Sequence, residues 1–458
     1  MKKFLLLGLA CLSSLSAFAD QDPATYEPTN GVQCTNRWLI ARTNDKFNGG
    51  VTKLAGFYSK IRTATIYNDY AIFGWSKTMT YEVGDSTASN DFAHLLIYDL
   101  SEGTQLKEVQ LTVNGEPIAG TLCANQIGTD DAGNLWIASL VFDTSKTPIS
   151  IFKVDDIETG ACTQVASLVL PEDEASAFGR MDYCHIIGDI TGETSGAVFM
   201  SPMSSQGGAT GCWVHRWILP EGGTEWEPGF DGYVCWDTSE LETYPAGQTV
   251  WNGAPTVTIV KDEAFEGQNF YIDAFVTAPV LYNTEGGVVD GFMNNEEMAP
   301  AVGTNGVAEF AIGDRNFIVY SLAQYNVSPG CQVRIAELGE GMSFSGMTGL
   351  WDIPTAGLGE VSDGGLRVHN LMVSPVEDAN GKQGVYLLNY KSNNGAAVYC
   401  IAEEGFQDKE VGIEDIVDDA VNAAPVYYNL QGVKVANPEN GLYIVKRGNN
   451  ATKEVVVK

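Results

Sequence analysis

The chain has 458 residues, of which 58 are acidic and 26 basic, so its formal net charge is −32 at pH 7. A field of that sign repels the phosphate backbone, which excludes nucleic acid as an expected partner. Hydrophobic residues make up 44% of the chain and glycines number 50, a composition typical of a folded, turn-rich protein rather than a disordered one.

Residues 1–19 have the pattern of a secretory signal peptide. Two lysines precede an apolar run at 4–12, and small residues stand before Asp20, where we expect cleavage. A lipoprotein signal at Cys11 is the alternative, and it is disfavoured because Gly8 stands where leucine is usual. No later stretch reaches the ~18 unbroken apolar residues of a membrane-spanning helix, so we expect no transmembrane segment.

Between residues 34 and 404 the sequence repeats a unit of two short apolar runs separated by a loop, with almost no helical periodicity. The first runs lie 47 to 73 residues apart and begin at Ala71, Leu135, Ala197, Phe270, Phe317 and Val385. Second runs begin at His94, Ile149, Trp213, Cys331 and Ala396. This quasi-period, with turn residues between the runs, predicts a β-propeller.

The ends of the repeated region indicate how the ring closes. The run at 37–41 precedes the first full unit, and we expect it to supply the outer strand of the last blade so that no sheet edge stays open. Segments 233–236 and 256–260 are candidates for an extra blade. We therefore predict an all-β fold with a six- or seven-bladed β-propeller and a small C-terminal β-strand unit. A pair of β-sandwiches is the alternative.

The second repeat, at residues 128–140, has the clearest turn-and-strand pattern. Residues 128–140 resemble the turn and following strand of regulator-type and lyase-type propeller repeats, and are also similar to the Asp-box turn of sialidases. We expect Asp131 and Asn134 to cap the turn, Gly133 to take a positive φ and Trp136 to pack between blades. The Asp-box is a structural turn in sialidases. Their catalytic arginine cluster and Tyr/Glu pair are not assigned in this chain.

The chain changes character after residue 404. Residues 405–424 are acid-rich, and we predict a linker there between a propeller at 20–404 and a C-terminal unit at 425–458. Within the C-terminal unit, three short strand patterns follow one another. Residues 428–432 (Tyr-Asn-Leu-Gln-Gly), residues 441–446 (Gly-Leu-Tyr-Ile-Val-Lys) and the valine-rich end resemble the C-terminal sorting domain of Bacteroidetes proteins exported by Type IX secretion. The motif residues are Gly432, Gly441, Tyr443, Lys446 and Lys458. The resemblance implies export machinery as a partner and a secreted or outer-membrane surface location.

Signals for catalysis are sparse. The four histidines fall in different repeat units, and serine-hydrolase elbows, phosphate loops and calcium loops of the DxDxDG kind are all missing. We assign no catalytic residue, metal site or cofactor, while a weak Ca²⁺ site at residues 130–131 or 155–156 stays open. Eight cysteines follow the signal peptide without a CxxC pair, so disulfides are permitted and a structural zinc is not indicated.

Tryptophan is concentrated in one region. Five of nine tryptophans fall within 39 residues, interleaved with glycine, proline and acids. Aromatic rings in loops stack on sugar rings, and we take Trp226, Trp236 and Trp251 as candidate ligand-binding residues. Trp213 and Trp217 lie in a strand run, where we expect core packing.

The sequence therefore favours an exported, non-catalytic propeller that binds a glycan or protein ligand at the cell surface. The alternative is a polysaccharide-active hydrolase or lyase that uses channel carboxylates such as Asp182, Asp273 or Asp314, which would need two acids ~5–9.5 Å apart. A passive structural component of the envelope is a third hypothesis.

Overall fold

The computed structural model describes seventeen segments of the chain, which belong to two compact units. The described residues are 22–42, 60–83, 86–142, 147–169, 180–202, 211–237, 255–260, 269–274, 277–283, 287–300, 306–322, 328–360, 369–408, 426–428, 434–435, 441–447 and 450–456. The proposed signal peptide, most of the acidic linker, Trp251, Gly432 and Lys458 lie outside these segments. Within them, no helix is long and apolar enough to cross a membrane.

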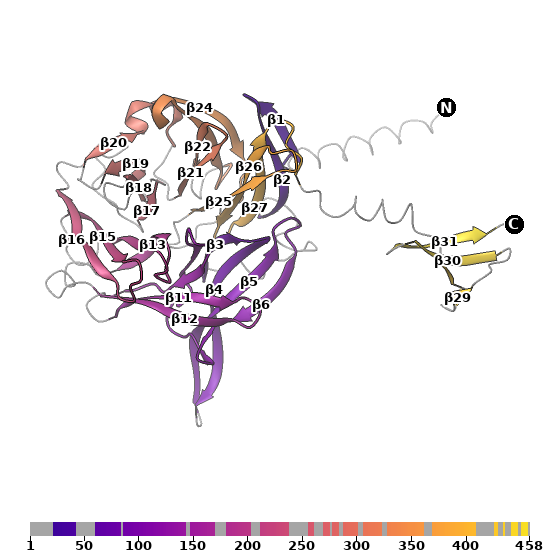
Figure 1. The fold of residues 1–458 in the computed structure, drawn as a ribbon, viewed down its shortest axis with the longest axis horizontal. Helices are drawn as coiled ribbons and strands as arrows, with labels where there is room; N and C mark the ends of the chain where they lie inside the picture. Colours follow the sequence, from indigo (N-terminus) through magenta and orange to yellow (C-terminus); the bar gives the residue numbers. More distant parts are fainter. Residues whose placement is uncertain are drawn as a thin grey trace, which may run out of the picture. The chain divides into compact units, whose positions relative to one another are not determined.

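The first unit is a six-bladed β-propeller (Figure 1). Each blade has four antiparallel strands that lie side by side outward from an inner strand. Blade 1 consists of β3 (Ile61–Tyr67), β4 (Tyr70–Val83), β5 (Ser86–Asp99) and β6 (Gln105–Gln110). Blade 2 consists of β9 (Gln126–Thr129), β10 (Leu135–Ala138), β11 (Ile149–Asp156) and β12 (Ala161–Leu168), and is extended by β7 (Thr112–Val113) and β8 (Glu116–Pro117). The added strand β7 pairs parallel to β12. Blade 3 consists of β13 (Met181–Gly188), β14 (Gly196–Pro202), β15 (Gly211–Leu219) and β16 (Glu227–Asp237).

The remaining blades complete the ring. Blade 4 consists of β17 (Thr256–Ile259), β18 (Asn269–Ala274), β19 (Thr277–Asn283) and β20 (Val288–Gly291). Blade 5 consists of β21 (Val307–Ile312), β22 (Arg315–Ser321), β23 (Val333–Gly339) and β24 (Ser343–Ile353). Blade 6 consists of β25 (His369–Glu377), β26 (Gln383–Lys391) and β27 (Gly395–Glu403), joined by β2 (Val32–Ala41) and β1 (Thr25–Thr29). Three short 3₁₀ turns, η1 (Phe292–Asn294), η2 (Glu296–Met298) and η3 (Glu340–Met342), lie beside blades 4 and 5.

The six apolar runs recognised in the sequence are the second strands of the blades, β4, β10, β14, β18, β22 and β26. The predicted all-β propeller is therefore confirmed. Of the two blade numbers, six is confirmed, and the candidate seventh blade does not form. Residues 233–236 belong to β16, the outer strand of blade 3, and residues 256–259 form β17, the inner strand of blade 4. The two candidate segments thus close one blade and open the next.

The N-terminal strands close the ring. β2 pairs with β27 from Val32 opposite Glu403 to Ala41 opposite Gly395, so the predicted closing strand at 37–41 is confirmed. The first two strands of the propeller thus complete its last blade. The third strand of blade 6, β27, is therefore hydrogen-bonded on both sides, like the third strands of the other blades.

A single carboxylate anchors the segment before β1. Asp22 accepts hydrogen bonds from the side chains of Asn36 at 2.6 Å and Tyr399 at 2.9 Å. It also accepts one from the backbone N–H of Thr355 at 2.7 Å and one from the hydroxyl of Tyr26. Asp22 therefore ties the start of the described chain to blade 5 and to blade 6.

The hydrophobic core lies between the blades. Phe73 of β4 packs edge-to-face against Tyr98 and against Tyr390 of β26, with ring centroids 5.3 and 5.1 Å apart. All three rings are fully buried, and each such burial stabilises the fold by about 2–3 kcal/mol. Because neighbouring blades bury both faces of a sheet, the second strands are apolar on both sides, which explains the near-continuous apolar runs of the sequence.

The predicted turn of blade 2 forms with one change of roles. Asp130, rather than Asp131, caps it: its carboxylate accepts the backbone N–H of Asn134 at 2.7 Å. Asp131 instead accepts the backbone N–H of Gly188 at 2.8 Å, which links blade 2 to blade 3. Gly133 has the predicted positive φ, at 84°. Trp136 is buried among residues of blades 2 and 3, as predicted.

The second unit contains one four-stranded sheet. Its strands are β28 (Val426–Tyr428), β29 (Lys434–Val435), β30 (Gly441–Arg447) and β31 (Asn450–Val456), in the order β29-β28-β30-β31. The first of the three predicted strand patterns is thus a pair of strands, β28 and β29, rather than one. Gly441, Tyr443 and Lys446 of the sorting motif lie in β30, and their role in export stays a prediction.

Candidate functional site

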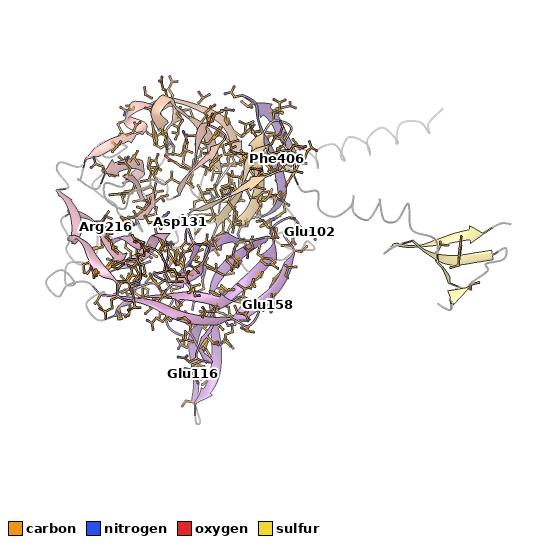
Figure 2. The ribbon with its side chains drawn as sticks, viewed as in Figure 1. Glu102, Glu116, Asp131, Glu158, Arg216 and Phe406 are labelled. Carbon is orange, nitrogen blue, oxygen red and sulfur yellow. The ribbon has the colours of Figure 1, made fainter. Side chains whose placement is uncertain are left out.

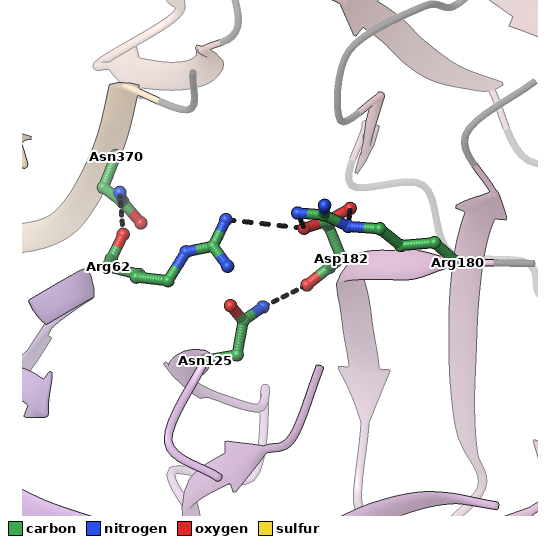
Figure 3. A network of polar contacts seen from close by, with 5 residues as sticks. All are labelled: Arg62, Asn125, Arg180, Asp182 and Asn370. Carbon is green, nitrogen blue, oxygen red and sulfur yellow. Dashed lines mark hydrogen bonds and ion pairs between the residues drawn. The ribbon is translucent and has the colours of Figure 1, made fainter. Parts of the chain in front are cut away.

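Buried polar side chains gather where the inner strands of the propeller begin. Because every blade starts with its inner strand, these starts meet at one end of the central axis. Four blades contribute a polar residue there, Arg62 from β3, Asn125 from the residue before β9, Asp182 from β13 and Asn370 from β25. With Arg180, which precedes β13, we call them the central cluster (Figure 3).

Asp182 is the hub of the central cluster. Arg180 donates two hydrogen bonds to the carboxylate of Asp182, from Nε to Oδ2 at 2.7 Å and from Nη2 to Oδ1 at 2.6 Å. The Nη2 atom of Arg62 approaches the same Oδ1 at 3.4 Å, at the long end of hydrogen-bonding distance. Figure 3 shows the two guanidinium groups reaching Asp182 from different blades. Asp182 is thus largely satisfied by Arg180, and Arg62 is the less tightly held cation.

Two buried atoms of the central cluster have no partner within the described segments. Arg62 is 3% exposed, and its Nε–H donates no hydrogen bond. Asn125 is fully buried; its Nδ2 donates to the carbonyl of Asp182, but its Oδ1 accepts nothing. A buried polar atom left unpaired costs about 1–3 kcal/mol. The cluster therefore holds one unsatisfied donor and one unsatisfied acceptor.

The charge of the central cluster opposes that of the whole protein. Two guanidinium groups face one carboxylate, which leaves a surplus of one positive charge in a chain of formal charge −32. Acidic side chains such as Glu102, Glu116 and Glu158 lie exposed on the blades (Figure 2). A buried cation in low-dielectric surroundings interacts strongly with an anion that reaches it.

An exposed aromatic ring borders the central cluster. Phe142 is 48% exposed, and the Cζ atom of Arg180 lies 5.3 Å from its ring centroid. Hydrogen bonds between the backbones of Val141 and Met181, at 2.9 and 3.2 Å, hold the two segments together. The side chain of Arg180 is 20% exposed, so this edge connects the cluster to solvent.

Two protonatable carboxyls tie blade 4 to blade 5. Burial raises the pKa of Asp273, on β18, to about 7, although its carboxyl accepts hydrogen bonds from the hydroxyl of Thr256 and the backbone N–H of Gly306. Burial likewise raises the pKa of Glu309, on inner strand β21, to about 7, and Glu309 accepts a hydrogen bond from the hydroxyl of Tyr271. Asp273 is fully buried, whereas Glu309 keeps some solvent exposure.

His369 has a structural environment. Its Nδ1 lies 3.1 Å from the hydroxyl of Ser321, and its Nε2 contacts Oδ1 of Asn389. Burial, followed by the nearby charge of Lys391, lowers the pKa of His369 to about 3, so the ring is neutral at pH 7. Within the described segments no group of three His, Cys, Asp or Glu side chains is placed to hold a metal ion.

The predicted ligand-binding tryptophans do not belong to the central cluster as far as the structure describes them. Trp226 is half-buried against the core between blades 2 and 3, and its indole N–H donates to the carbonyl of Val165 at 2.9 Å. Trp236 lies on β16 and Trp251 falls outside the described residues. Their binding role stays a prediction. Trp217 is buried, as predicted.

The three carboxylates suggested for a hydrolase have three different environments. Asp182 sits between two arginines, Asp273 is fully buried at the seam of blades 4 and 5, and Asp314 is exposed in the hairpin between β21 and β22. Neither arginine nor Phe142 is recognisable as a site residue from the sequence. The usable signal was a charged residue near the start of an inner strand, as in β3 and β13, one strand upstream of the recognised runs.

Comparisons with known proteins concern the fold. No model of a known protein family matches the chain, and no curated protein matches it. Among solved structures, an exo-1,5-α-L-arabinanase from a bovine ruminal metagenomic library is 12% identical, covers 68% of this chain and 95% of its own, and has a TM-score of 0.32. An α-L-arabinofuranosidase from Fusarium graminearum is 10% identical (76% and 93% covered, TM-score 0.39). Trypanosoma rangeli sialidase is 9% identical (91% and 67% covered, TM-score 0.40). At these identities the chain resembles them in fold alone.

Proposed function

We propose that the propeller is a binding protein that holds an anionic group of its ligand in the central cluster. The observation that carries this proposal is the buried guanidinium of Arg62, which has a hydrogen-bond donor to spare and only a 3.4 Å contact to Asp182. A ligand carboxylate that reaches Arg62 gains a charge-assisted hydrogen bond and removes the cost of the unpaired N–H. Arg180 offers the solvent-facing edge of the same cluster.

Calorimetric titration of the purified full chain with D-galacturonate and with glutarate, both ionised at pH 7, tests this proposal. We expect both probes to bind, and Arg62→Met to weaken both at least tenfold. Arg180 holds Asp182 with two hydrogen bonds, so the Arg62→Met variant leaves that carboxylate paired and should fold. Arg180→Met provides a second variant at the exposed edge, with the same expected loss.

A matched control is available on blade 5. Arg334 forms a two-bonded pair with Asp352, with distances of 2.7 and 2.9 Å, away from the central cluster. Arg334→Met removes the same type of ion pair and should leave both affinities unchanged. If neither probe binds the wild type, or if Arg62→Met binds as well as Arg334→Met, the central cluster is not an anion site.

One observation favours a second function, glycoside cleavage. Glu309 lies on an inner strand with partial solvent exposure, and its pKa of about 7 is that of a carboxyl able to donate a proton near neutral pH. The release of reducing ends from polygalacturonate tests it. Release by the wild type that is lost in Glu309→Gln would support cleavage, and binding without release would leave the binding function alone.

We propose that this binding protein acts at the cell surface. The signal-peptide pattern of residues 1–19 supports export across the inner membrane, and the resemblance of residues 425–458 to a sorting domain supports onward passage to the surface. A surface location suits a receptor site for external glycans. The partner for export would be the secretion machinery, engaged through the C-terminal unit.

A further inference from the structure

We infer that the ligand is a sugar acid, in which a carboxylate and hydroxyl groups belong to one ring. This inference rests on the proposed anion-binding function and narrows it to a chemical class. It follows from three features at one place in the fold: the spare donor of Arg62, the spare acceptor of Asn125, and the exposed ring of Phe142 beside Arg180.

The two unsatisfied atoms require opposite partners. Arg62 Nε–H needs an acceptor, which a carboxylate supplies, whereas Asn125 Oδ1 needs a donor, which a carboxylate lacks at neutral pH. A simple carboxylate therefore satisfies Arg62 and leaves Asn125 unpaired. A molecule with a hydroxyl close to its carboxylate satisfies both. Both atoms belong to residues in contact with Asp182, so the two requirements fall within one small volume.

The aromatic ring selects for a ring in the ligand. Phe142 is one of the few large hydrophobic side chains exposed on the described surface, and it stands at the solvent edge of the central cluster. Phenylalanine carries no polar group, and although Arg180 lies over its ring, 48% of the side chain stays exposed and can pack against an apolar face of a ligand. The C–H face of a pyranose supplies such a face, and its hydroxyls remain free to reach Asn125.

The same features disfavour an acidic peptide. The side chain of aspartate or glutamate carries a carboxylate on a flexible stem and no hydroxyl, so the donor for Asn125 would have to be a backbone N–H that the stem separates from the carboxylate. Its methylene groups also cover less of an aromatic face than a pyranose does. A peptide would still bind through Arg62, which makes it the comparison that the experiment requires.

The test compares four probes on the purified full chain by calorimetry at pH 7. D-galacturonate carries both groups, D-galactose carries hydroxyls alone, glutarate carries carboxylates alone, and a tetraglutamate peptide represents the acidic peptide. We expect D-galacturonate to bind at least tenfold more tightly than any of the other three. Phe142→Ala should weaken D-galacturonate by about three- to tenfold, the value of one aromatic contact, and leave glutarate unchanged. Phe142→Tyr, which keeps the ring, should restore the affinity.

The Asn125 acceptor has its own variant. Asn125→Ala removes the spare acceptor, so the preference for D-galacturonate over glutarate should fall while glutarate binding persists through Arg62. Equal binding of D-galacturonate and glutarate, with Phe142→Ala unchanged, would overturn the sugar-acid inference and leave the anion site standing. Tighter binding of tetraglutamate would overturn it in favour of a peptide. Failure of every carboxylate would instead refute the proposed function itself.

Discussion

The carboxylate of Asp22 accepts a hydrogen bond from the hydroxyl of Tyr399 at 2.9 Å, between residues 377 positions apart in the sequence. With Asn36 and Thr355 also donating to it, Asp22 joins the first described residues to the last two blades.

We expect Asp22→Ala to lower the free energy of unfolding by about 2–3 kcal/mol, because hydrogen bonds to a carboxylate are stronger than neutral ones. Urea denaturation measures this loss. Asp314→Ala, at an exposed aspartate, should change stability by less than about 0.5 kcal/mol, and an equal loss in both variants would contradict the anchoring role.

The seam between blades 4 and 5 should respond to pH. The pKa of Glu309 is raised from 4.5 to about 7, so the folded protein keeps a proton that the unfolded chain has released. This stabilisation is complete below about pH 4 and is lost as pH rises through 7. Between pH 5 and pH 8 the wild type should lose about 2 kcal/mol more unfolding free energy than Glu309→Gln, whose amide does not titrate. Asp273 contributes in the same direction, since its pKa is also about 7.

A control separates this effect from general repulsion among the acids of the chain. Glu116 is exposed on β8, so Glu116→Gln should follow the wild-type pH dependence. Urea denaturation at the two pH values measures all three proteins. Parallel curves for wild type and Glu309→Gln would remove Glu309 as the source of the dependence.

Gly103 should be sensitive to a single methyl group. Its φ is +65°, and a Cβ there would lie 2.5 Å from the ring of Trp38 on the closing strand β2. We expect Gly103→Ala to destabilise the protein by about 3 kcal/mol, from the left-handed backbone and the overlap with the ring together. Gly133→Ala isolates the backbone part, because its φ is +84° and nothing lies within 4 Å, so its cost should be about 1 kcal/mol. Thermal unfolding of both variants decides whether the difference exists.

Four buried thiols of the propeller should be inert in the folded protein. They belong to Cys34, Cys123, Cys162 and Cys184. Burial raises the pKa of Cys123 to about 11 and that of Cys162 to about 12, which suppresses the reactive thiolate. A thiol reagent should label them only after denaturation. Thr163→Cys, which places a thiol at an exposed neighbour of Cys162, should label at once in the native state. Fast labelling of any of these four thiols in the native wild type, located by peptide mapping, would contradict the burial.

The terminal segments make a prediction about export. N-terminal sequencing of the secreted protein should begin at Asp20, and deletion of residues 425–458 should remove the protein from the cell surface while the propeller still folds. Surface labelling of intact cells measures the location. A truncated protein that still reached the surface would contradict the sorting role of the C-terminal unit.

The sequence was sufficient for the part of the fold that is buried on both faces. The second strand of every blade is an apolar run, such as residues 71–75 of β4, and repeats of such runs define a propeller. Inner strands were missed because they mix polar and apolar residues, as in Arg62 and Thr63 of β3. The sequence allows a seventh blade because 73 residues separate the runs at Ala197 and Phe270, a distance that a long connection between blades explains as well.

The candidate site could not be read from the sequence because its members are distant along the chain. Arg62 and Asp182 are separated by 120 residues and meet only when the ring closes. Neither residue stands in a recognisable motif, and Asn125 looks like any turn residue until its carboxamide is found buried. Polar networks of this kind depend on burial and partner geometry, and local sequence patterns encode neither.

The strand that completes the ring, β2, is made before the other five blades. β2 can pair with β1 as soon as both are made, yet its other partner β27 ends at Glu403, so the backbone N–H and C=O groups that face β27 wait unpaired while five blades are produced. Pairings between such distant residues form slowly, and an unpaired edge invites association with other chains. Any factor that shields the N-terminal segment until Glu403 is available would therefore govern the yield of folded protein.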